Sequence, residues 1–490
     1  MADTPGKPRC TLYFRATVRL MIVCESRSAA ALRAAPGSWP GRVGAIGAAV
    51  VGVVLWLAAG VVSAQPPVPG DRTGRSDARE GMRPLPISEL APSASQVSPS
   101  VEAYPLELLG LLGAPPEPAP ITLVPSIAVS EEYTDNLFLD NRQRQSEFIT
   151  ALSPTLALFV ERPSYRLSAG YSFAGQLYAR ESRFNNAVDR QNFVANAFYQ
   201  PTPRLSLSAF DSFALNRDTN LVATRGFATG RQESWSNTVG AGVTYQISRP
   251  SSVSVSATYG VLRFLGADTT SAAAGGADSD TYKLQGIFER VVTRRLTAIG
   301  SYGFAYFDFL GQADNAMTHT PSVGVAYHVT PTLLASVSGG PSITLVGGET
   351  LVNPAVTARL LETWRLGSAS VQYTRTVDIA GGFGGPTETQ TVSAVVALPT
   401  WQRGMVAVIS PAYVIAESLG GRRTASSGNL DIKAFTLPVG VTYRLNRFTS
   451  LFAGYTFFRQ RTGSASSGAV DVDQNRVRFG LQFGYPFALY

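Results

Sequence analysis

The chain has 490 residues, of which 45% are hydrophobic and 15% are charged, and its formal net charge is +7 at pH 7. Residues 1–64 hold seven of the 41 Lys and Arg residues and two of the 34 Asp and Glu residues, so the remainder has 34 basic and 32 acidic residues, a net charge of +2. This near neutrality excludes nucleic acid as a partner recognised through overall charge.

The first predicted element is an export signal in residues 1–64. Residues 43–62 form an uncharged apolar run that is long enough to span a membrane. The run ends in Val62-Ser63-Ala64 before Gln65, which is typical of a signal-peptidase site, so we expect Sec-dependent export and cleavage. An uncleaved inner-membrane anchor is the alternative, and Met21 is an alternative start. Both cysteines lie in this segment, which excludes disulfides and thiolate metal sites from the rest of the chain.

Residues 65–120 are rich in Pro, Ser and Arg. A segment of this composition buries too little apolar surface to order itself, so we interpret it as a periplasmic tail. Within it, residues 102–112 contain five leucines and could form a short helix that touches the following domain. A loosely ordered segment is the alternative.

Residues 121–490 show the alternation of β-strands whose two faces differ. In the last strand, four apolar residues alternate with four that are small or polar: Val477, Phe479, Leu481 and Phe483 against Arg476, Arg478, Gly480 and Gln482. Segments 166–173, 238–247 and 253–261 repeat the pattern. Because successive side chains on a strand point to opposite faces, one face is apolar and the other polar. The sequence therefore predicts an all-β domain over 121–490.

Short turns alternate with longer polar loops along this domain. The short turns are expected near 162–164, 201–203, 249–251, 293–295, 330–332, 366–367, 401–404 and 446–447, and the longer loops near 140–146, 181–187, 218–232, 266–280, 311–317, 347–352, 381–388, 418–430 and 462–472. Eight turns and nine loops join 18 strands, and short periplasmic turns with longer extracellular loops are typical of outer-membrane proteins. We therefore predict a transmembrane antiparallel up-and-down β-barrel of about 18 strands, with 16 as the fallback.

Prolines within the predicted strands should disturb the barrel locally. Pro154, Pro321, Pro341 and Pro438 each lack the backbone donor that a strand ladder needs, so we expect irregularity at these positions. The chain ends in an aromatic residue after an alternating strand, which is typical of the signal read by the barrel-assembly machinery. Pro486 interrupts this last run, and Phe487 is an alternative strand end.

The first predicted strand carries a family resemblance. The segment from Val124 to Phe138, which contains Pro-Ser at its start and Tyr133, Asp135 and Asn136 near its end, resembles the opening of a β-barrel porin family found beside exopolysaccharide-export and exosortase systems. Ser153-Pro154 resembles the next element of that family. The resemblance covers about 30 residues closely. It implies an outer-membrane barrel, with polysaccharide-export components as partners, and it supplies no catalytic residues.

The two histidines offer little catalytic chemistry. His319 and His328 are nine residues apart, so on one strand they would face opposite sides and could not share a metal or a proton. A hydrolase at the barrel rim, using His319 with Ser322 or Asp314, is a minor alternative. We expect no enzymatic activity, no metal and no cofactor.

An acidic cluster lies at the first predicted loop: Glu131, Glu132, Asp135, Asn136, Asp140 and Asn141, with Asp471 and Asp473 as a weaker case. Its oxygens could bind calcium or the divalent ions that bridge lipopolysaccharide. A solvated loop is the favoured interpretation. The glycine-rich segment 381–385 has no following lysine or helix and is read as a hairpin loop, not as a phosphate site.

The phase of the strands gives candidate pore-lining residues: Arg166, Gln176, Gln246, Arg359, Arg375, Arg476, Arg478 and Gln482. A slip of one residue would reverse each assignment. Barrels of 16–18 strands enclose an aqueous channel, so we predict a passive pore or exit channel for exopolysaccharide or small polar and anionic solutes. A non-transporting docking barrel of an envelope complex is the alternative. The 266–280 loop is the best candidate to fold inward. Other expected partners are outer-membrane lipid and lipopolysaccharide.

Overall fold

The computed structural model describes residues 120–490, except for 217–218, 223–226, 232, 266–277, 311–313, 365–366, 380–384, 400–401, 403, 420–430, 463–470 and 490, together with the short segments 10–12 and 22–24. The chain divides into two compact units, Met1–Asp71 and Arg72–Tyr490. In the first unit, β1 (Cys10–Leu12) pairs antiparallel with β2 (Ile22–Cys24). The predicted leader and tail otherwise lie outside the described residues.

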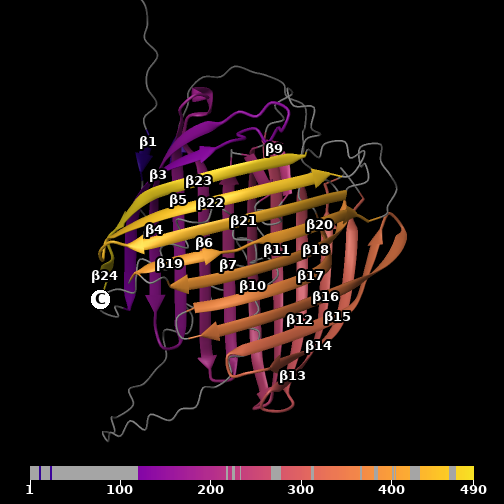
Figure 1. Cartoon of the computed structure of the whole chain (residues 1–490). Helices are drawn as coiled ribbons and strands as arrows, with labels where there is room; N and C mark the ends of the chain where they lie inside the picture. Colours follow the sequence, from indigo (N-terminus) through magenta and orange to yellow (C-terminus); the bar gives the residue numbers. More distant parts are fainter. Residues whose placement is uncertain are drawn as a thin grey trace, which may run out of the picture. The chain divides into compact units, whose positions relative to one another are not determined.

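The second unit is built of antiparallel strands that follow one another round a wall (Figure 1). The first strands are β3 (Ile121–Thr134), β4 (Glu147–Glu161), β5 (Tyr165–Tyr178), β6 (Asn186–Thr202), β7 (Leu205–Asn216), β10 (Glu233–Ser248), β11 (Ser251–Leu265), β12 (Ser279–Val291), β13 (Leu296–Asp308) and β14 (Ala316–His328). The remaining strands are β15 (Leu333–Val346), β16 (Glu349–Trp364), β17 (Gly367–Ile379), β18 (Pro386–Pro399), β19 (Met405–Ile409), β20 (Ala412–Ser418), β21 (Asp431–Arg444), β22 (Thr449–Thr462), β23 (Val472–Gly484) and β24 (Phe487–Leu489).

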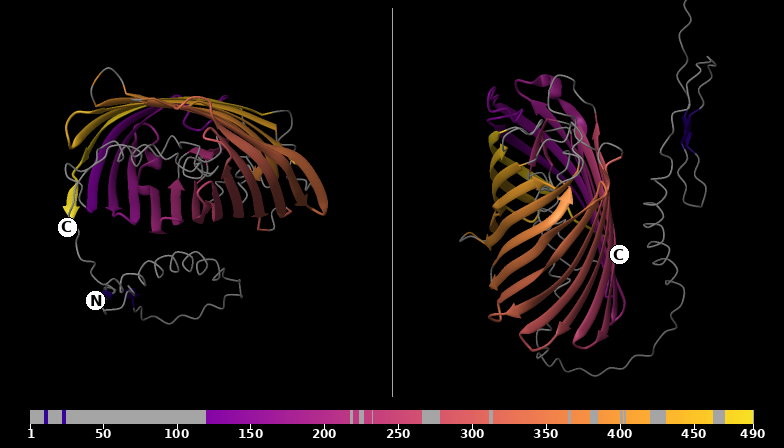
Figure 2. Two further views of the ribbon diagram at one scale, coloured as in Figure 1. Left: turned by 90° about the horizontal axis from the view of Figure 1, so that it is seen from below. Right: turned by 90° about the vertical axis from the view of Figure 1, so that its right-hand side faces the viewer.

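These twenty segments form a closed barrel of 18 strands. β19 and β20 are one strand interrupted at Pro411, and β23 and β24 are one strand interrupted at Pro486, because both members of each pair keep one register against a common neighbour. The last strand closes the barrel against β3, and every pairing is antiparallel (Figure 2). The predicted all-β fold and strand number are confirmed.

Two short elements lie in the connections. The 3-10 helix η1 (Ser182–Phe184) follows β5, and β8 (Thr219–Val222) pairs with β9 (Phe227–Arg231) between β7 and β10. In the described part of the chain, no helix is long and apolar enough to cross a membrane.

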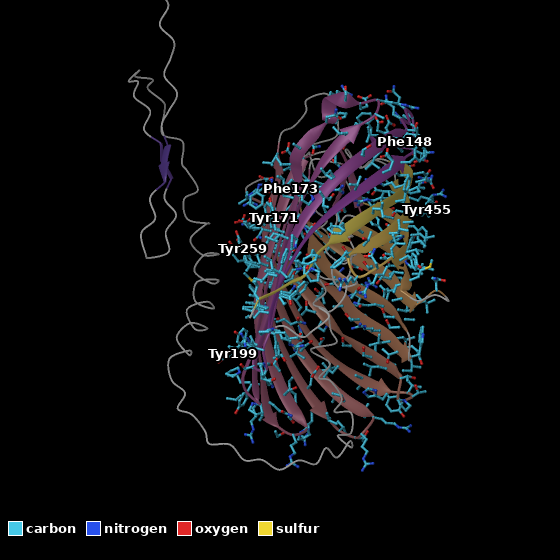
Figure 3. The ribbon with its side chains drawn as sticks, turned by 90° about the vertical axis from the view of Figure 1, so that its left-hand side faces the viewer. Phe148, Tyr171, Phe173, Tyr199, Tyr259 and Tyr455 are labelled. Carbon is cyan, nitrogen blue, oxygen red and sulfur yellow. The ribbon has the colours of Figure 1, made fainter. Side chains whose placement is uncertain are left out.

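The two faces of the wall differ in chemistry. On β23, Val477, Phe479 and Leu481 are exposed, whereas Arg476 and Gln482, which flank this run and have the opposite parity, are buried. Side chains on the concave side of a closed barrel lie close together and are buried, whereas those on the convex side are exposed. We therefore call the face of exposed apolar side chains the outer face and the opposite one the inner face. Tyr171, Tyr199 and Tyr259 lie on the outer face (Figure 3).

The connections correct one detail of the prediction. The described short turns lie where they were expected, for example between β10 and β11 and between β12 and β13. The connection between β15 and β16, expected as a longer loop over 347–352, is a two-residue turn. Gly347 (φ 57°) and Gly348 (φ 83°) adopt the left-handed backbone that such hairpin turns require, so β16 begins earlier than predicted, at Glu349.

Irregularities at the prolines are confirmed. The ladder between β4 and β5 has a gap at Pro154, and the ladder between β14 and β15 has a gap where Pro321 faces Pro341. Pro438 of β21 is paired with β22 on one side. On the other side of β21, it lies opposite the interruption at Pro411 that separates β19 from β20. Each site lacks a backbone donor, so the ladder opens there without a shift of register.

Candidate functional site: the inner face and two segments folded into it

The inner face next to the closing seam carries three of the predicted lining residues. Arg476 bonds to the Glu132 carboxylate through both Nε (2.9 Å) and Nη2. Arg478 donates to Ser130 Oγ from Nε (3.2 Å) and Nη2 (3.1 Å), and its guanidinium lies 5.6 Å from the ring centroid of Phe452. These contacts join β23 to β3 and place both guanidinium groups on the inner side of the wall.

A further arginine belongs to this group. The charges of Arg476, Arg478 and Arg190 all act on the Glu132 carboxylate. Arg190 lies on the inner face of β6, opposite Ala174 of β5. These three arginines form a cluster on the inner face, which we call the arginine patch. The sequence analysis missed Arg190 and the lumenal position of Glu132, although the alternation of 190–199 contains the signal.

Other predicted lining residues are spread along the inner face. Gln176 is buried near one end of β5, where its Oε1 accepts hydrogen bonds from Tyr178 Oη (3.2 Å) and Asn186 Nδ2 (3.5 Å). Arg166 lies near the other end, with its guanidinium 4.8 Å from the centroid of Phe198.

Gln482 is the third lining candidate next to the closing seam, and it donates to Ser126 Oγ (3.3 Å) on the inner face. Two further candidates lie on β10 and β16. Gln246 donates to the Arg249 carbonyl at a turn. Arg359 shares the inner face of β16 and faces Gln372 of β17. These residues therefore do not converge on one point.

Arg375 corrects the prediction. It faces Val356 of β16, which shares the outer face with the exposed Leu360. Arg375 is thus on the face opposite to the one predicted. Its Nε bonds to Glu388 Oε1 at 2.5 Å, and the two side chains are 31% and 10% exposed. The reason is the alternation of the strand: Arg375 lies four residues after the exposed Val371 of β17, so both belong to the outer face.

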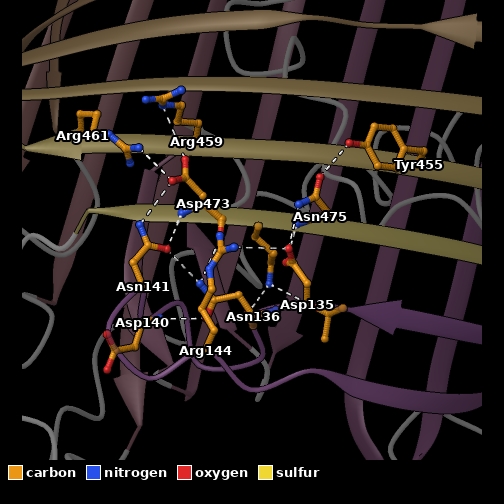
Figure 4. A network of polar contacts seen from close by, with 12 residues as sticks. Asp135, Asn136, Asp140, Asn141, Arg144, Tyr455, Arg459, Arg461, Asp473 and Asn475 are labelled. Atoms are coloured by element: carbon orange, nitrogen blue, oxygen red, sulfur yellow. Dashed lines mark hydrogen bonds and ion pairs between the residues drawn. The ribbon is translucent and has the colours of Figure 1, made fainter.

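The family-like motif at the end of β3 joins the first strand to the last (Figure 4). Asp135 accepts hydrogen bonds from the backbone N (2.7 Å) and Nδ2 (2.8 Å) of Asn475. Asn136 is fully buried, and its Nδ2 donates to the carbonyl of Asp473 (3.0 Å). Tyr133 packs against Phe148, with 5.0 Å between ring centroids. The motif therefore fastens one end of the barrel seam.

Residues of the predicted acidic cluster take part in the same hydrogen-bond network. Asn141 Oδ1 accepts from the backbone N of Asp473 (2.9 Å), and Arg461 Nη2 bonds to Asp473 Oδ2 (2.8 Å). Arg144 lies 3.7 Å from Asp135 Oδ2, and Asp140 Oδ1 accepts from the backbone of Arg142. Within the described residues, no group of three or more metal-ligating side chains could hold an ion. The carboxylates have protein donors and cations as partners.

The loop that follows β3 folds onto the inner face. Leu139 is 2% exposed and belongs to a cluster of inner-face residues from β20, β21, β22 and β23, which also contains Val414, Ala416, Ile432, Ala434, Phe458 and Val472. Leu137 packs with Ile149 of β4 and Tyr178 of β5. The loop over 135–146 is therefore held across the inner side of strands on both sides of the seam. The predicted inward loop, 266–280, lies almost wholly outside the described residues.

A second segment bends inward at the ends of β17 and β18, which we call the β17–β18 tip (376–379 and 386–388). The ladder between β16 and β17 stops at Val356 and Arg375, although both strands continue. Beyond that point, Asn353 Nδ2 on the inner face of β16 bonds to Glu388 of β18. Because β17 separates β16 from β18 in the wall, this contact requires the tip to lean over the inner face.

An ion pair crosses the lumen beside this tip. Lys283 Nζ on the inner face of β12 lies 3.2 Å from Asp378 Oδ2 on β17. Four strands, β13 to β16, separate the two in the wall. At about 4.8 Å per strand, the path along the wall is roughly 24 Å, so the side chains meet only because the pair spans the interior. The lumen is therefore narrowed from two sides.

The structure does not bring His319 and Ser322 together. His319 is on the outer face, where its Nδ1 is hydrogen-bonded to Tyr302 Oη (2.7 Å). Ser322 is on the inner face and hydrogen-bonds Ser301. His328 is at the other end of β14. His319 and Ser322 thus lie on opposite sides of the wall and cannot react together.

No protein-family model matches the sequence, and no curated protein matches it. Among solved structures, the chain is similar to OccAB4 of Acinetobacter baumannii (11% identity, TM-score 0.38, covering 75% of this chain and 98% of that one) and to OpdQ of Pseudomonas aeruginosa (10%, 0.39, 75% and 98%). It is also similar to OccK2 (OpdF) of Pseudomonas aeruginosa, solved in complex with glucuronate (10%, 0.38, 75% and 98%). These values are too low to support a conclusion about function.

Proposed function

We propose that this protein is a passive pore of the bacterial outer membrane for small polar and anionic solutes. The observation that carries the proposal is the closed 18-strand wall with an apolar outer face and arginines on its inner face. Barrels of this strand number enclose an aqueous channel, and closure leaves no unpaired edge in hydrocarbon. Sec-dependent export, insertion by the barrel-assembly machinery and contact with lipopolysaccharide follow from this location.

The preference for anions rests on the patch formed by Arg190, Arg476 and Arg478. The Glu132 carboxylate lies near these three charges, and it bonds to Arg476. A rigid guanidinium suits carboxylates and phosphates, and fixed positive charge in a channel raises the local concentration of anions. Acidic residues elsewhere on the inner face, such as Glu289, moderate the effect. We therefore propose a modest preference for anions.

Solute entry into proteoliposomes tests the proposal. The protein is purified from membranes of cells that express the full chain and is reconstituted, and swelling is compared in isosmotic glucose and gluconate, which are similar in size. Swelling in both solutes, and faster swelling in gluconate, is expected. Vesicles that behave like protein-free vesicles would reject the pore and favour the docking barrel.

Export of exopolysaccharide is a more specific alternative to passage of small solutes. It derives from the family resemblance at Tyr133, Asp135 and Asn136. A polymer exit channel would have to accommodate a chain past the first loop and the β17–β18 tip. Entry of dextrans several sugars long at rates close to that of glucose would favour this alternative. Exclusion of such dextrans, with free entry of glucose, is expected for the small-solute pore.

A further inference from the structure

We propose that Lys283 is the anion-binding group at the narrow part of the lumen, and that Asp378 is its built-in counter-ion, which a small carboxylate or phosphate solute displaces. The inference rests on the proposed pore function and adds a specific site to it. The site differs from the arginine patch at the seam, because it lies between β12 and β17.

The ion pair joins two strands, β12 and β17, that four other strands separate in the wall. Asp378 belongs to the β17–β18 tip, and Thr387 Oγ1 donates to the carbonyl of Asp378 at 3.0 Å. The pair of Arg375 with Glu388, and the bond of Asn353 to Glu388, hold the tip over β16. These contacts fix the position of the Asp378 carboxylate in front of Lys283 and do not depend on Lys283 itself.

The exposure of the pair makes exchange with a solute feasible. The Lys283 side chain is 35% exposed and the Asp378 side chain 22% exposed, so water and ions in the lumen reach both. A partly solvated ion pair adds little net stability, and salt screens it. A solute anion that arrives at Lys283 therefore needs to replace only a weak internal partner.

The choice of lysine is itself informative. After residue 64 the chain has only two lysines, against 32 arginines. An ammonium group is a compact, hydrated charge on a flexible stem, which changes partners more readily than a guanidinium held in a two-pronged contact. Lys433, the other lysine, lies on the outer face of β21 opposite Arg461. It thus provides a matched control for Lys283.

The kind of solute that Lys283 would bind follows from its present partner, the carboxylate of Asp378. The carboxylate of Asp378 occupies the position that a solute carboxylate would take, with Nζ within 3.4 Å of both of its oxygens. A singly or doubly charged carboxylate therefore fits the site, and a phosphate offers the same oxygen geometry. A neutral sugar offers no charge to compete with Asp378.

The test measures block of the chloride current by succinate in planar bilayers that contain the protein. In the wild-type protein, succinate should reduce the current in a dose-dependent way. Lys283→Gln should raise the half-blocking concentration at least about tenfold. Asp378→Asn, which removes the internal competitor, should lower it by roughly threefold to fivefold, the range expected for a weak pair. Lys433→Gln should leave it unchanged.

Three outcomes would overturn the inference. The first is that Lys283→Gln and Lys433→Gln change the block equally, and the second is that Asp378→Asn weakens it. The third is that succinate fails to block the wild-type current, in which case the pore itself would stand. A wild-type protein without current would instead reject the proposed pore. Asparagine has the same shape as aspartate, and the Asp378→Asn substitution leaves the tip contacts of Glu388 intact. The circular dichroism spectrum of each variant should therefore keep its β-sheet signal, which shows that the result refers to folded protein.

Discussion

At the scale of single residues, Gly340 is a position where the structure leaves no room for a side chain. A Cβ at Gly340 would lie 1.9 Å from the carbonyl oxygen of Pro321, which is a backbone atom and cannot rotate away as a side chain could. Gly340→Ala should therefore lower the free energy of unfolding by about 2 kcal/mol or more, as overpacking does. The measurement is chemical denaturation in lipid vesicles. Gly286→Ala, where a Cβ meets nothing within 4 Å, is the control and should change it by less than about 0.5 kcal/mol.

Asn136 illustrates a residue whose side chain fastens two distant parts of the chain. It is fully buried and bonds to the carbonyl of Asp473 and the backbone N of Asp140. Asn136→Ala leaves these buried groups without partners, so we expect a loss of about 1–3 kcal/mol in the free energy of unfolding. Asn196→Ala, at an exposed position on β6, should be nearly neutral. Equal effects of the two substitutions in the same denaturation experiment would contradict the role of the motif at the seam.

At the scale of single elements, the strands were predictable and the bends were not. Alternation over 476–483 reflects one apolar and one polar face, which is a local property of the sequence. The bend of the β17–β18 tip depends on contacts of Asn353 with Glu388 and of Lys283 with Asp378, which are distant in sequence. Arg375 is a different case, because the alternation of β17 already places it with the exposed Val371 on the outer face. The two-residue turn at 347–348 was also missed, although two glycines between alternating runs are a recognisable hairpin signal.

The first loop can be tested as an element that narrows the lumen. Leu139 is buried against the inner faces of β20, β21, β22 and β23 and has a left-handed backbone (φ 54°). Leu139→Ala should destabilise the protein by about 3 kcal/mol, and it should raise single-channel conductance because the loop loses its anchor. Both changes are measurable on the same reconstituted protein.

Leu310 provides a matched control for this prediction. It also has a left-handed backbone (φ 52°), but it is 46% exposed. Leu310→Ala repeats the backbone effect of the substitution without the loss of buried contacts, so its stability and conductance should stay close to the wild-type values. A conductance that rises equally in both variants would show that the Leu139 anchor does not narrow the pore.

At the scale of the whole molecule, closure connects the fold to the proposed function. The last strand pairs with β3 from Thr134 opposite Arg476 to Ile121 opposite Leu489, across the interruption at Pro486. The sequence predicted that the ends meet, because an even number of strands returns the chain to its starting side. It could not predict that two segments narrow the interior, because those contacts join residues as far apart as Leu139 and Val472.

The most direct test of the central claim is the reversal potential of the reconstituted protein in a planar bilayer that separates two potassium chloride concentrations. An aqueous pore lined by the arginine patch should give stepwise currents, with a reversal potential of the sign set by chloride. Replacing Arg478 by Gln should move that potential toward zero, since it removes one of the three charges near Glu132. A silent membrane, or a potential of the sign set by potassium, would contradict the account.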